Sequence, residues 1–269
     1  MPILIIIRIA NKTTKKYLYK VPTNTLFTGK QIIHLPSCPS TNRFATDLMS
    51  ENDIVEGTVI VTDHQTEGRG QRGNSWESAP GENLTFSLVL RPKFLQAQQQ
   101  FDLNIVISLA ISDLLLSYGL PAIKIKWPND IYCNDGKVAG ILIENIVGGN
   151  QALNYSIVGI GLNVNQLDFN DLKAVSMRNL MNRKYPLENV FGALLSQIEQ
   201  HYLLLKQGAM RGIRNAYIAN LYWLREMHYF KSDRIIYGMI MGVDTVGRLE
   251  IEEKGKISRF DSKQISFKE

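Results

Sequence analysis

Glycines and arginines alternate in one short segment, residues 65–76, and could together bind an anion. The glycines are Gly68, Gly70 and Gly73, and the arginines between them are Arg69 and Arg72. Glycine lets the backbone bend sharply and approach a ligand closely. Successive backbone N–H groups in such a bend point to one side and form an anion-binding concavity. The segment therefore predicts a site for a phosphate or a carboxylate.

The same glycines match the dinucleotide fingerprint Gly-x-Gly-x-x-Gly from Gly68 to Gly73. That fingerprint has meaning only where the third glycine opens a helix. Here residues 74–81 are loop-forming, and the next regular segment, residues 83–91, has the character of a strand. The dinucleotide interpretation is therefore disfavoured. A solvated turn whose arginines do no chemistry remains the alternative for this loop alone.

A second cluster downstream, Lys-Trp-Pro-Asn-Asp from Lys126 to Asp130, changes that balance. With the glycine loop, it resembles the biotin–protein ligase family, also called holocarboxylase synthetases. Further matches occur in family order at Ser40-Thr41-Asn42, Gln65, residues 136–144 and residues 159–165. The resemblance extends from about Ile32 to the C-terminus.

The resemblance implies an α+β fold, with the mixed sheet flanked by helices that biotin ligases share with class II aminoacyl-tRNA synthetases. A small C-terminal SH3-like β-barrel would follow. The chain would then divide into an N-terminal extension of unknown role (1–30), a catalytic biotin- and ATP-binding domain (31–226) and the SH3-like domain (227–269). A change to short alternating strands after about Tyr229 agrees with this division.

The resemblance also implies a two-step ligase reaction with ATP and biotin as substrates. The biotin carboxylate attacks the α-phosphate of ATP, giving biotinyl-5′-AMP and pyrophosphate. A lysine of a biotin carboxyl carrier domain, such as that of acetyl-CoA carboxylase, then attacks the acyl carbon and displaces AMP. Both steps bring anions together, so catalysis should rest on positioning and positive charge. Mg²⁺ should bridge triphosphate oxygens.

The family's motifs assign residues of this chain to each part of that site. Lys126 and Arg69 are the implied catalytic residues, and Lys126 faces both the biotin carboxylate and the α-phosphate. The residues implied at biotin are Ser40, Thr41, Asn42, Gln65, Arg69, Gly70, Gln71 and Lys126. Those implied at the nucleotide are Arg72, Trp76, Asn129, Lys137 and Asn163. No metal site is made by protein alone, and Asp130 either touches Mg²⁺ or only caps its turn.

Some of these residues have a second interpretation. Many family members have arginine where this chain has Gln71, which keeps hydrogen bonding but loses a charge that Arg72 could replace. Trp76 either packs along the intermediate or is a core aromatic residue. Ser40 and Thr41 can cap a helix, a role compatible with binding because a helix N-terminus is itself an anion site.

Hydrophobic periodicity places these motifs on expected elements. Strands are expected at residues 31–35, 57–62, 83–91, 123–126, 137–146 and 153–165, with a turn over 128–136. Helices are expected at residues 40–50, 96–118, 187–206 and 211–224. Short C-terminal strands are expected at residues 234–241, 248–252 and 257–260.

Composition limits the partners. The chain of 269 residues has a net charge of +5, which suits an anionic small molecule or an acidic partner but is too small to indicate nucleic acid. Cys38 and Cys133 form no CxxC pair, so a reducing, cytoplasmic location is expected. The four histidines show no metal-ligand spacing. The apolar start, residues 2–10, is too short to cross a bilayer, so no membrane partner is expected.

Two other functions compete with the ligase. One is a lipoate–protein ligase or octanoyltransferase of the same fold, against which Trp76 and the Lys126–Asp130 motif count. The other is a non-enzymatic biotin-sensing regulator. The roughly 30 residues before the catalytic region lack a two-helix pattern, so neither a DNA-binding domain nor a nucleic-acid partner is expected. A homodimer remains a candidate assembly.

We predict that residues 67–74 exchange amide hydrogens quickly without ligand and become protected when biotinyl-5′-AMP is bound. The glycines give the loop freedom, and the bound anion would supply the contacts that order it. Hydrogen-exchange mass spectrometry measures both states, and equal protection in the two would contradict the prediction.

Overall fold

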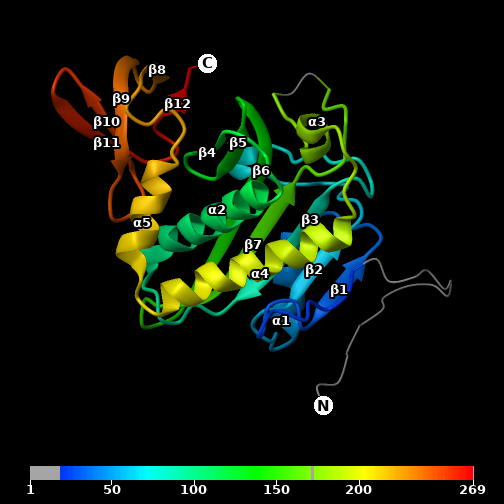
Figure 1. The fold of residues 1–269 in the computed structure, drawn as a ribbon. Coiled ribbons are helices and arrows are strands. Elements are labelled where there is room, and N and C mark those ends of the chain that lie inside the picture. The colour runs from blue at the N-terminus through cyan, green and yellow to red at the C-terminus, as the bar shows by residue number, and fades with distance from the viewer. Residues whose placement is uncertain (1–18, 171–172, 269) are drawn as a thin grey trace.

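A seven-stranded mixed sheet forms the body of the computed structural model, which describes residues 19–170 and 173–268 (Figure 1). Only the outer pair β1–β2 is parallel, and the other neighbours are antiparallel. The strands, in spatial order, are β1 (Ile32–Leu35), β2 (Val59–Thr62), β3 (Leu84–Leu90), β7 (Leu153–Leu162), β6 (Gly136–Val147), β5 (Asp130–Cys133) and β4 (Ile123–Lys126).

Helices cover the two faces of this sheet unequally (Figure 1). On one face, α2 (Gln100–Ser117) and α4 (Leu187–Lys206) pack together over the larger hydrophobic core. On the other face, α1 (Thr41–Glu51) contacts β2, β3 and β7 over a smaller apolar cluster. Two shorter helices follow the sheet strands, α3 (Met177–Met181) and α5 (Met210–Ala219).

The period-two alternation of strand side chains gives the two faces different chemistry. On β3, Leu84, Phe86 and Leu88 point into the larger core. The residues between them, Thr85 and Ser87, are polar and therefore belong to the opposite face, which α1 covers only in part. One strand thus supplies both an apolar core and a polar surface.

A second sheet follows in the chain, with strand order β11-β10-β9-β8-β12 and antiparallel pairing throughout. Its strands are β8 (Met227–Lys231), β9 (Ile235–Val243), β10 (Leu249–Glu253), β11 (Lys256–Phe260) and β12 (Ser266–Phe267). We call it the small sheet, and it lies at the end of α5 beside β4 (Figure 1). The three C-terminal strands expected from the sequence are confirmed, whereas β8 and β12 were not expected.

The expectation of a turn over residues 128–136 was wrong, because β5 (Asp130–Cys133) lies in the middle of that segment. Ile131 and Cys133 are fully buried, and Cys133 pairs with Gly136 on β6. Asn134 and Asp135 join the two strands with φ values of 47° and 64°, as a tight hairpin of this kind requires. The hairpin residues were visible in the sequence, but the strand before them was too short to stand out.

The helix expected at residues 211–224 ends earlier, at Ala219. The chain after it runs beside β4, where Ile125 donates its N–H to the Asn220 carbonyl and accepts from the N–H of Tyr222. This pairing, centred on Leu221 opposite Ile125, covers the outer edge of the sheet, and the chain leaves the helix to make it.

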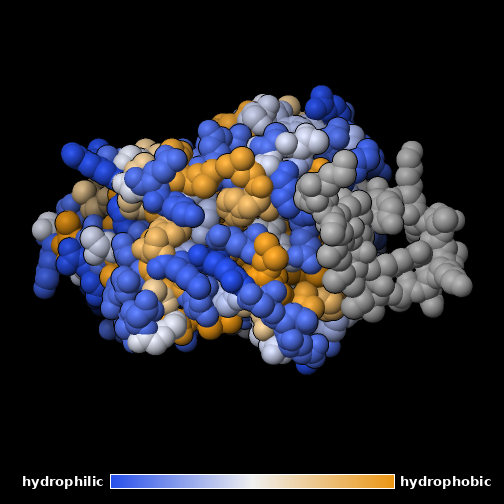
Figure 2. All heavy atoms as spheres, turned by 90° about the horizontal axis from the view of Figure 1, so that it is seen from below, coloured by the Kyte–Doolittle hydropathy of each residue, from blue (hydrophilic) through white to orange (hydrophobic). Residues whose placement is uncertain are grey.

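One apolar helical segment, Ala97–Ser117, is the part of the described chain with the length and composition of a membrane span, and most of it is buried inside the fold. It includes α2, whose contacts with α4, β4 and β6 are those of a core helix. Figure 2, which views the molecule from below, shows surface apolar residues in patches separated by hydrophilic ones.

Residues 19–30 pack onto the large sheet and its helices, whereas residues 1–18 of the expected extension lie outside the described residues. The backbone N–H groups of Leu26, Phe27 and Thr28 donate to the buried carboxylate of Glu199 on α4 at 2.5, 2.9 and 2.8 Å. Burial raises the pKa of Glu199, but these hydrogen bonds outweigh it and hold the pKa below its usual range. The N-terminal segment is therefore anchored to α4 by one carboxylate.

We predict that Glu199→Gln lowers the free energy of unfolding by about 1–3 kcal/mol at pH 7. The glutamine amide has one neutral acceptor oxygen, whereas the carboxylate accepts the three hydrogen bonds with two charged oxygens. The folded pKa lies below the ordinary value of 4.5, so the charge stabilises the fold above that value and the stabilisation is lost as pH falls through the folded pKa. Urea unfolding at pH 7 and near pH 3 should show the difference between wild type and variant shrinking at the lower pH.

Glu188→Gln is the matched control, since Glu188 lies on the same helix in an exposed ion pair with Lys20. It should change stability by only about 0–1 kcal/mol. Equal effects of the two substitutions would show that the carboxylate of Glu199 does not anchor the segment.

Candidate active site

The site occupies the polar face of the large sheet, where glycines leave the strand backbone bare. Thr85, Gly161 and Gly140 lie side by side across β3, β7 and β6, and Ser87, Gly159 and Leu142 form the next row. A β-carbon on Gly161 would lie 2.2 Å from the Trp76 ring, and one on Gly159 would lie 2.4 Å from Asn42 Oδ1. Only glycine permits these approaches. Residues of both rows line a cavity of about 320 Å³.

Trp76 lies flat in this cavity over Gly161 and next to Gly140. Its buried Nε1–H has no acceptor among the described residues. The ammonium of Lys137 stands 5.6 Å from the ring centroid. A buried donor without a partner in a ligand-sized cavity is available to a bound molecule.

The N-terminus of α1 forms one end of the cavity. Ser40 caps the helix by accepting from the N–H of Arg43 at 3.5 Å. Asn42 donates to Glu144 Oε2 at 2.7 Å and to the Leu142 carbonyl at 3.2 Å. These bonds fix the side chains of α1 against the sheet before any ligand arrives.

Hydroxyl and amide groups continue that network across the cavity end. Ser87 Oγ lies 2.6 Å from Asn42 Oδ1 and 2.7 Å from Thr41 Oγ1. Gln65 Oε1 accepts from the backbone N–H of Thr41 at 2.8 Å. Both capping and binding interpretations of residues 40–42 therefore fit the geometry.

The glycine–arginine segment is a narrow loop that borders the cavity. Trp76 donates its N–H to the Gly68 carbonyl at 3.0 Å, and Gly70 donates to Asn74 at 2.7 Å. A β-carbon at Gly68 would lie 2.2 Å from the Trp76 carbonyl, so glycine is required where the two sides of the loop meet. Arg69 and Gln71 line the cavity from this loop.

The opposite wall carries the Lys126–Asp130 motif. Lys126, at the end of β4, lies 3.1 Å from the Tyr132 hydroxyl. Asn129 donates to the Ile141 carbonyl at 2.6 Å and so ties the motif to β6. Asp130 forms an ion pair with Lys137 at 2.7 Å.

The cavity brings together most of the residues that the sequence singled out. They are Ser40, Thr41, Asn42, Gln65, Arg69, Gly70, Gln71, Trp76, Lys126, Asn129, Asp130 and Lys137. Asn163 is not among the lining residues: it is buried and donates to the carbonyls of Lys137 and Val175. The side chain of Arg72 lies outside what the structure describes.

Sequence reasoning missed other residues of the cavity wall, including Thr85 on β3 and the three C-terminal residues Ile265, Ser266 and Phe267. It also missed Ser87, which supports the wall. Polar residues alternating with leucine and phenylalanine on β3 were a usable signal for Thr85 and Ser87. Nothing in the local sequence indicated that β12 reaches the cavity.

The charges of this cavity suit an anionic ligand. Three cationic side chains, Arg69, Lys126 and Lys137, line it against one carboxylate, Asp130, among the described residues. No group of three His, Cys, Asp or Glu side chains in residues 19–170 and 173–268 could hold a metal ion. A divalent cation here would depend on oxygens of the ligand together with Asp130.

Neither cysteine is an activated nucleophile. Burial raises the pKa of the Cys133 thiol to about 11. Burial also raises the pKa of Cys38, against a smaller opposing effect of a hydrogen bond with Thr62. Both thiols are protonated at neutral pH, so the chemistry of the cavity rests on its cations and hydrogen-bond donors.

Known proteins resemble this chain in sequence and in fold. The sequence model of the biotin/lipoate A/B protein ligase family matches residues 35–163. The bifunctional ligase/repressor BirA of Bacillus spizizenii is 30% identical over 245 residues, covering 89% of this chain and 74% of that protein. The chain belongs to the biotin protein ligase family. BirA of Escherichia coli is 28% identical over 261 residues, covering 89% of this chain and 75% of that protein.

Membership of the biotin protein ligase family extends to the fold. The biotin protein ligase from Aquifex aeolicus in complex with biotin and ATP has a TM-score of 0.75 at 27% identity, covering 89% of this chain and 99% of that one. The segment matched by the family model contains α1, the glycine loop and β3 to β7, and hence most of the cavity. The part contributed by β12 lies outside it.

We predict that Gly161→Ala expels the Trp76 ring from the cavity, because its β-carbon would overlap the ring. Overpacking of this kind typically destabilises the local structure by about 1–3 kcal/mol. The Trp76 indole signal in a ¹H–¹⁵N spectrum should shift, and amide exchange over residues 68–76 should rise about tenfold to a hundredfold.

Gly149→Ala is the control, since Gly149 lies in the β6–β7 hairpin with open space around its α-carbon. It should leave the Trp76 signal and the exchange of residues 68–76 unchanged. An unchanged Trp76 signal in Gly161→Ala would mean that the ring does not rest on this glycine.

Proposed function

We propose that the chain is an ATP-dependent biotin–protein ligase that makes biotinyl-5′-AMP and transfers biotin to a lysine of a biotin carboxyl carrier domain. One observation carries the proposal. Lys126 lines a single cavity together with Thr41 and Gln65, which are hydrogen-bonded to each other, and with Asn129 and Lys137. That arrangement fits a ligand with a neutral polar head, a carboxylate and a nucleotide.

The first step joins two anions. A carboxylate oxygen of biotin attacks the α-phosphorus of ATP, the bond to the bridging oxygen of the β-phosphate breaks, and pyrophosphate leaves. Lys126 and Arg69 offset the repulsion between the carboxylate and the phosphate and the charge that develops on phosphate oxygens. They are therefore the proposed catalytic residues.

The second step transfers the acyl group. The ε-amine of the carrier lysine attacks the acyl carbon of biotinyl-5′-AMP, the carbon–oxygen bond to phosphate breaks, AMP leaves, and the amine loses a proton. The protein's contribution is orientation and exclusion of water, because AMP is already a good leaving group. Raised thiol pKa values at Cys38 and Cys133 agree with direct transfer.

The other residues divide between the two substrates. We assign Ser40, Thr41, Asn42, Gln65, Gly70 and Gln71 to biotin, alongside Arg69 and Lys126. Trp76, Asn129 and Lys137 are assigned to the nucleotide, and Arg72 supplies the charge that Gln71 lacks. Asn163 acts on the nucleotide side indirectly, because its side-chain amide donates to the Lys137 carbonyl and so holds the backbone there. Mg²⁺ would be held by triphosphate oxygens together with Asp130, whose carboxylate also forms an ion pair with Lys137.

The proposal includes the remaining features of such a ligase. Residues 31–226 form the catalytic domain and residues 227–269 an SH3-like barrel, to which the five antiparallel strands of the small sheet are suited. Residues 1–30 are an extension whose last part, residues 19–30, is anchored by Glu199. The enzyme works in the cytoplasm without nucleic acid or membrane, as a monomer or a homodimer.

We predict that Lys126→Ala slows adenylate formation by about 10²–10³-fold, because losing one preorganised donor typically costs about 3–4 kcal/mol of transition-state stabilisation. Lys126→Arg should recover only part of the loss, since a planar guanidinium cannot replace a compact ammonium. Pyrophosphate release with ATP and biotin, without carrier protein, isolates this step.

Lys124→Ala is the matched control, because Lys124 lies two residues earlier on β4 and outside the cavity. It should keep nearly the wild-type rate. Pyrophosphate release with lipoate in place of biotin would assign the chain to lipoate ligases instead. A Lys126→Ala enzyme as fast as the control would refute the role of Lys126.

A further inference from the structure

The ammonium of Lys126 is surrounded by aromatic rings from three separate segments. Its Nζ lies 4.6 Å from the ring centroid of Tyr132, 5.2 Å from that of Phe267 and 5.7 Å from that of Tyr222. All three distances are within the range of cation–π attraction. We call these three residues the aromatic cage.

Phe267 comes from β12, the two-residue strand at the edge of the small sheet. It is fixed there by ring contacts with Trp223 at 5.3 Å and Phe230 at 5.5 Å, and it pairs with Phe230 across the strands. Tyr222 packs beside it at 6.5 Å and donates its hydroxyl to Asp135 at 2.7 Å. The cage is therefore held from both the small sheet and the β5–β6 hairpin.

A second contact from the small sheet holds the neighbouring residue, Trp127. Its Nε1–H donates to the Gly247 carbonyl in the β9–β10 turn at 2.8 Å. Phe101 on α2 packs directly against Gly247, since a β-carbon added to Gly247 would lie 2.1 Å from the Phe101 ring. Consecutive residues of the catalytic motif thus each meet a different part of the small sheet.

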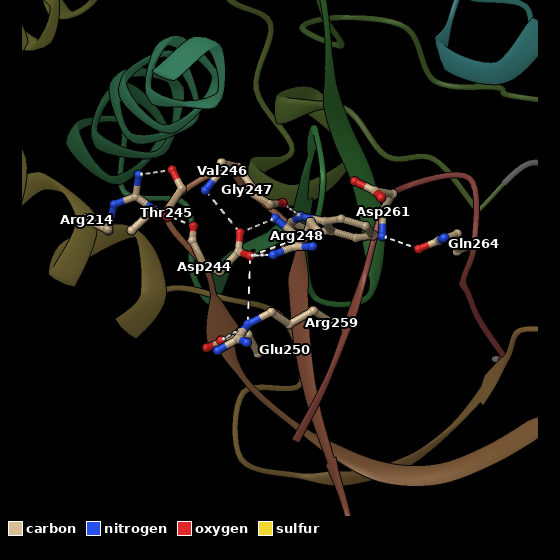
Figure 3. Close-up of polar contacts among 11 residues, drawn as sticks. Arg214, Asp244, Thr245, Val246, Gly247, Arg248, Glu250, Arg259, Asp261 and Gln264 are labelled. Carbon is tan, nitrogen blue, oxygen red and sulfur yellow. Dashed lines mark hydrogen bonds and ion pairs between the residues drawn. The ribbon is translucent and has the colours of Figure 1, made fainter. Parts of the chain in front are cut away.

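The β9–β10 turn is itself tightly fixed, as Figure 3 shows. Arg214 on α5 donates to the carbonyls of Asp244 and Thr245 at 2.7 and 3.2 Å and to the buried carboxylate of Asp102 at 2.6 Å. Asp244 accepts from the backbone N–H of Arg248 at 2.9 Å and from its side chain at 2.7 Å. The β9–β10 turn of the small sheet is therefore attached to both α2 and α5.

We infer that Phe267 is a positioning residue for Lys126, and that the aromatic cage holds the ammonium at the cavity wall before the substrates bind. A free lysine side chain samples many rotamers, and ordering it during the reaction would raise the barrier. The cage orders it beforehand at the wall of the cavity. The role in catalysis rests on the proposed function, whereas the holding of Lys126 does not.

Kinetics test the catalytic part. Phe267→Leu should lower kcat for pyrophosphate release with ATP and biotin about tenfold and change both KM values less than twofold, because the lost contact acts through Lys126. Phe267→Tyr, which keeps an aromatic ring at this position, should have a kcat within about twofold of the wild-type value. Tyr237→Leu, which removes an exposed ring from β9, is the matched control and should leave both parameters unchanged.

A double-mutant comparison separates positioning from general damage. In a Lys126→Ala background, Phe267→Leu should lower the remaining rate by less than twofold, since its effect requires the ammonium. An undiminished tenfold loss in that background, or a wild-type kcat in Phe267→Leu alone, would overturn the inference.

A spectroscopic readout keeps the test independent of activity. In wild type, ring currents should shift the ε-methylene proton signals of Lys126 upfield of those of Lys124, and Phe267→Leu should reduce that shift while Tyr237→Leu does not. If wild type releases no biotin-dependent pyrophosphate but shows this behaviour, the proposed function fails and the cage stands. Lys126 signals that do not respond to Phe267→Leu would overturn the cage whatever the activity.

Discussion

Close approach of side chains to a bare backbone is the constraint on which this site depends. Gly159 and Gly161 on β7 and Gly140 on β6 remove the β-carbons that would otherwise cover the polar face of the sheet. Asn42 reaches across one of these positions to bond Glu144, and Trp76 rests on the other two. The N-terminus of α1 and the glycine loop can meet over the sheet only because of these gaps.

The positive charges around the cavity are held in different ways, which suits different tasks. Lys137 is paired with Asp130 and stands beside the Trp76 ring. Lys126 is faced by neutral rings and a hydroxyl. Arg69 projects from a loop rich in glycine. The cavity thus draws its cations from β4, β6 and the glycine loop, and each is held by different contacts.

The sequence was most informative where local pattern and motif coincided. The helix expected at residues 187–206 has the bounds observed for α4, and the strand ending at Lys126 was also found. Most of the expected site residues share one cavity, and several of them, such as Ser40, Thr41 and Lys126, lie at the ends of elements that the periodicity had identified.

The features that sequence reasoning missed depend on contacts between distant segments. β5 lies among the turn-forming residues Pro128, Asn129, Asn134 and Gly136, and β12 has only two residues, so neither produced a local strand pattern. The buried position of Asn163 follows from carbonyls at Lys137 and Val175, which no local signal announces. The anchoring of residues 26–28 likewise depends on a glutamate more than 170 positions away.

The contact between Trp127 and Gly247 has a consequence for how such proteins can change over evolutionary time. The hydrogen bond at Trp127 depends on the path of this turn and not on the side chains of the turn. β11, at the edge away from β12, is therefore freer to diverge, whereas an insertion between Asp244 and Arg248 would displace the backbone that Trp127 contacts. Exchange of the small sheet between relatives should succeed only where the length of this turn is preserved.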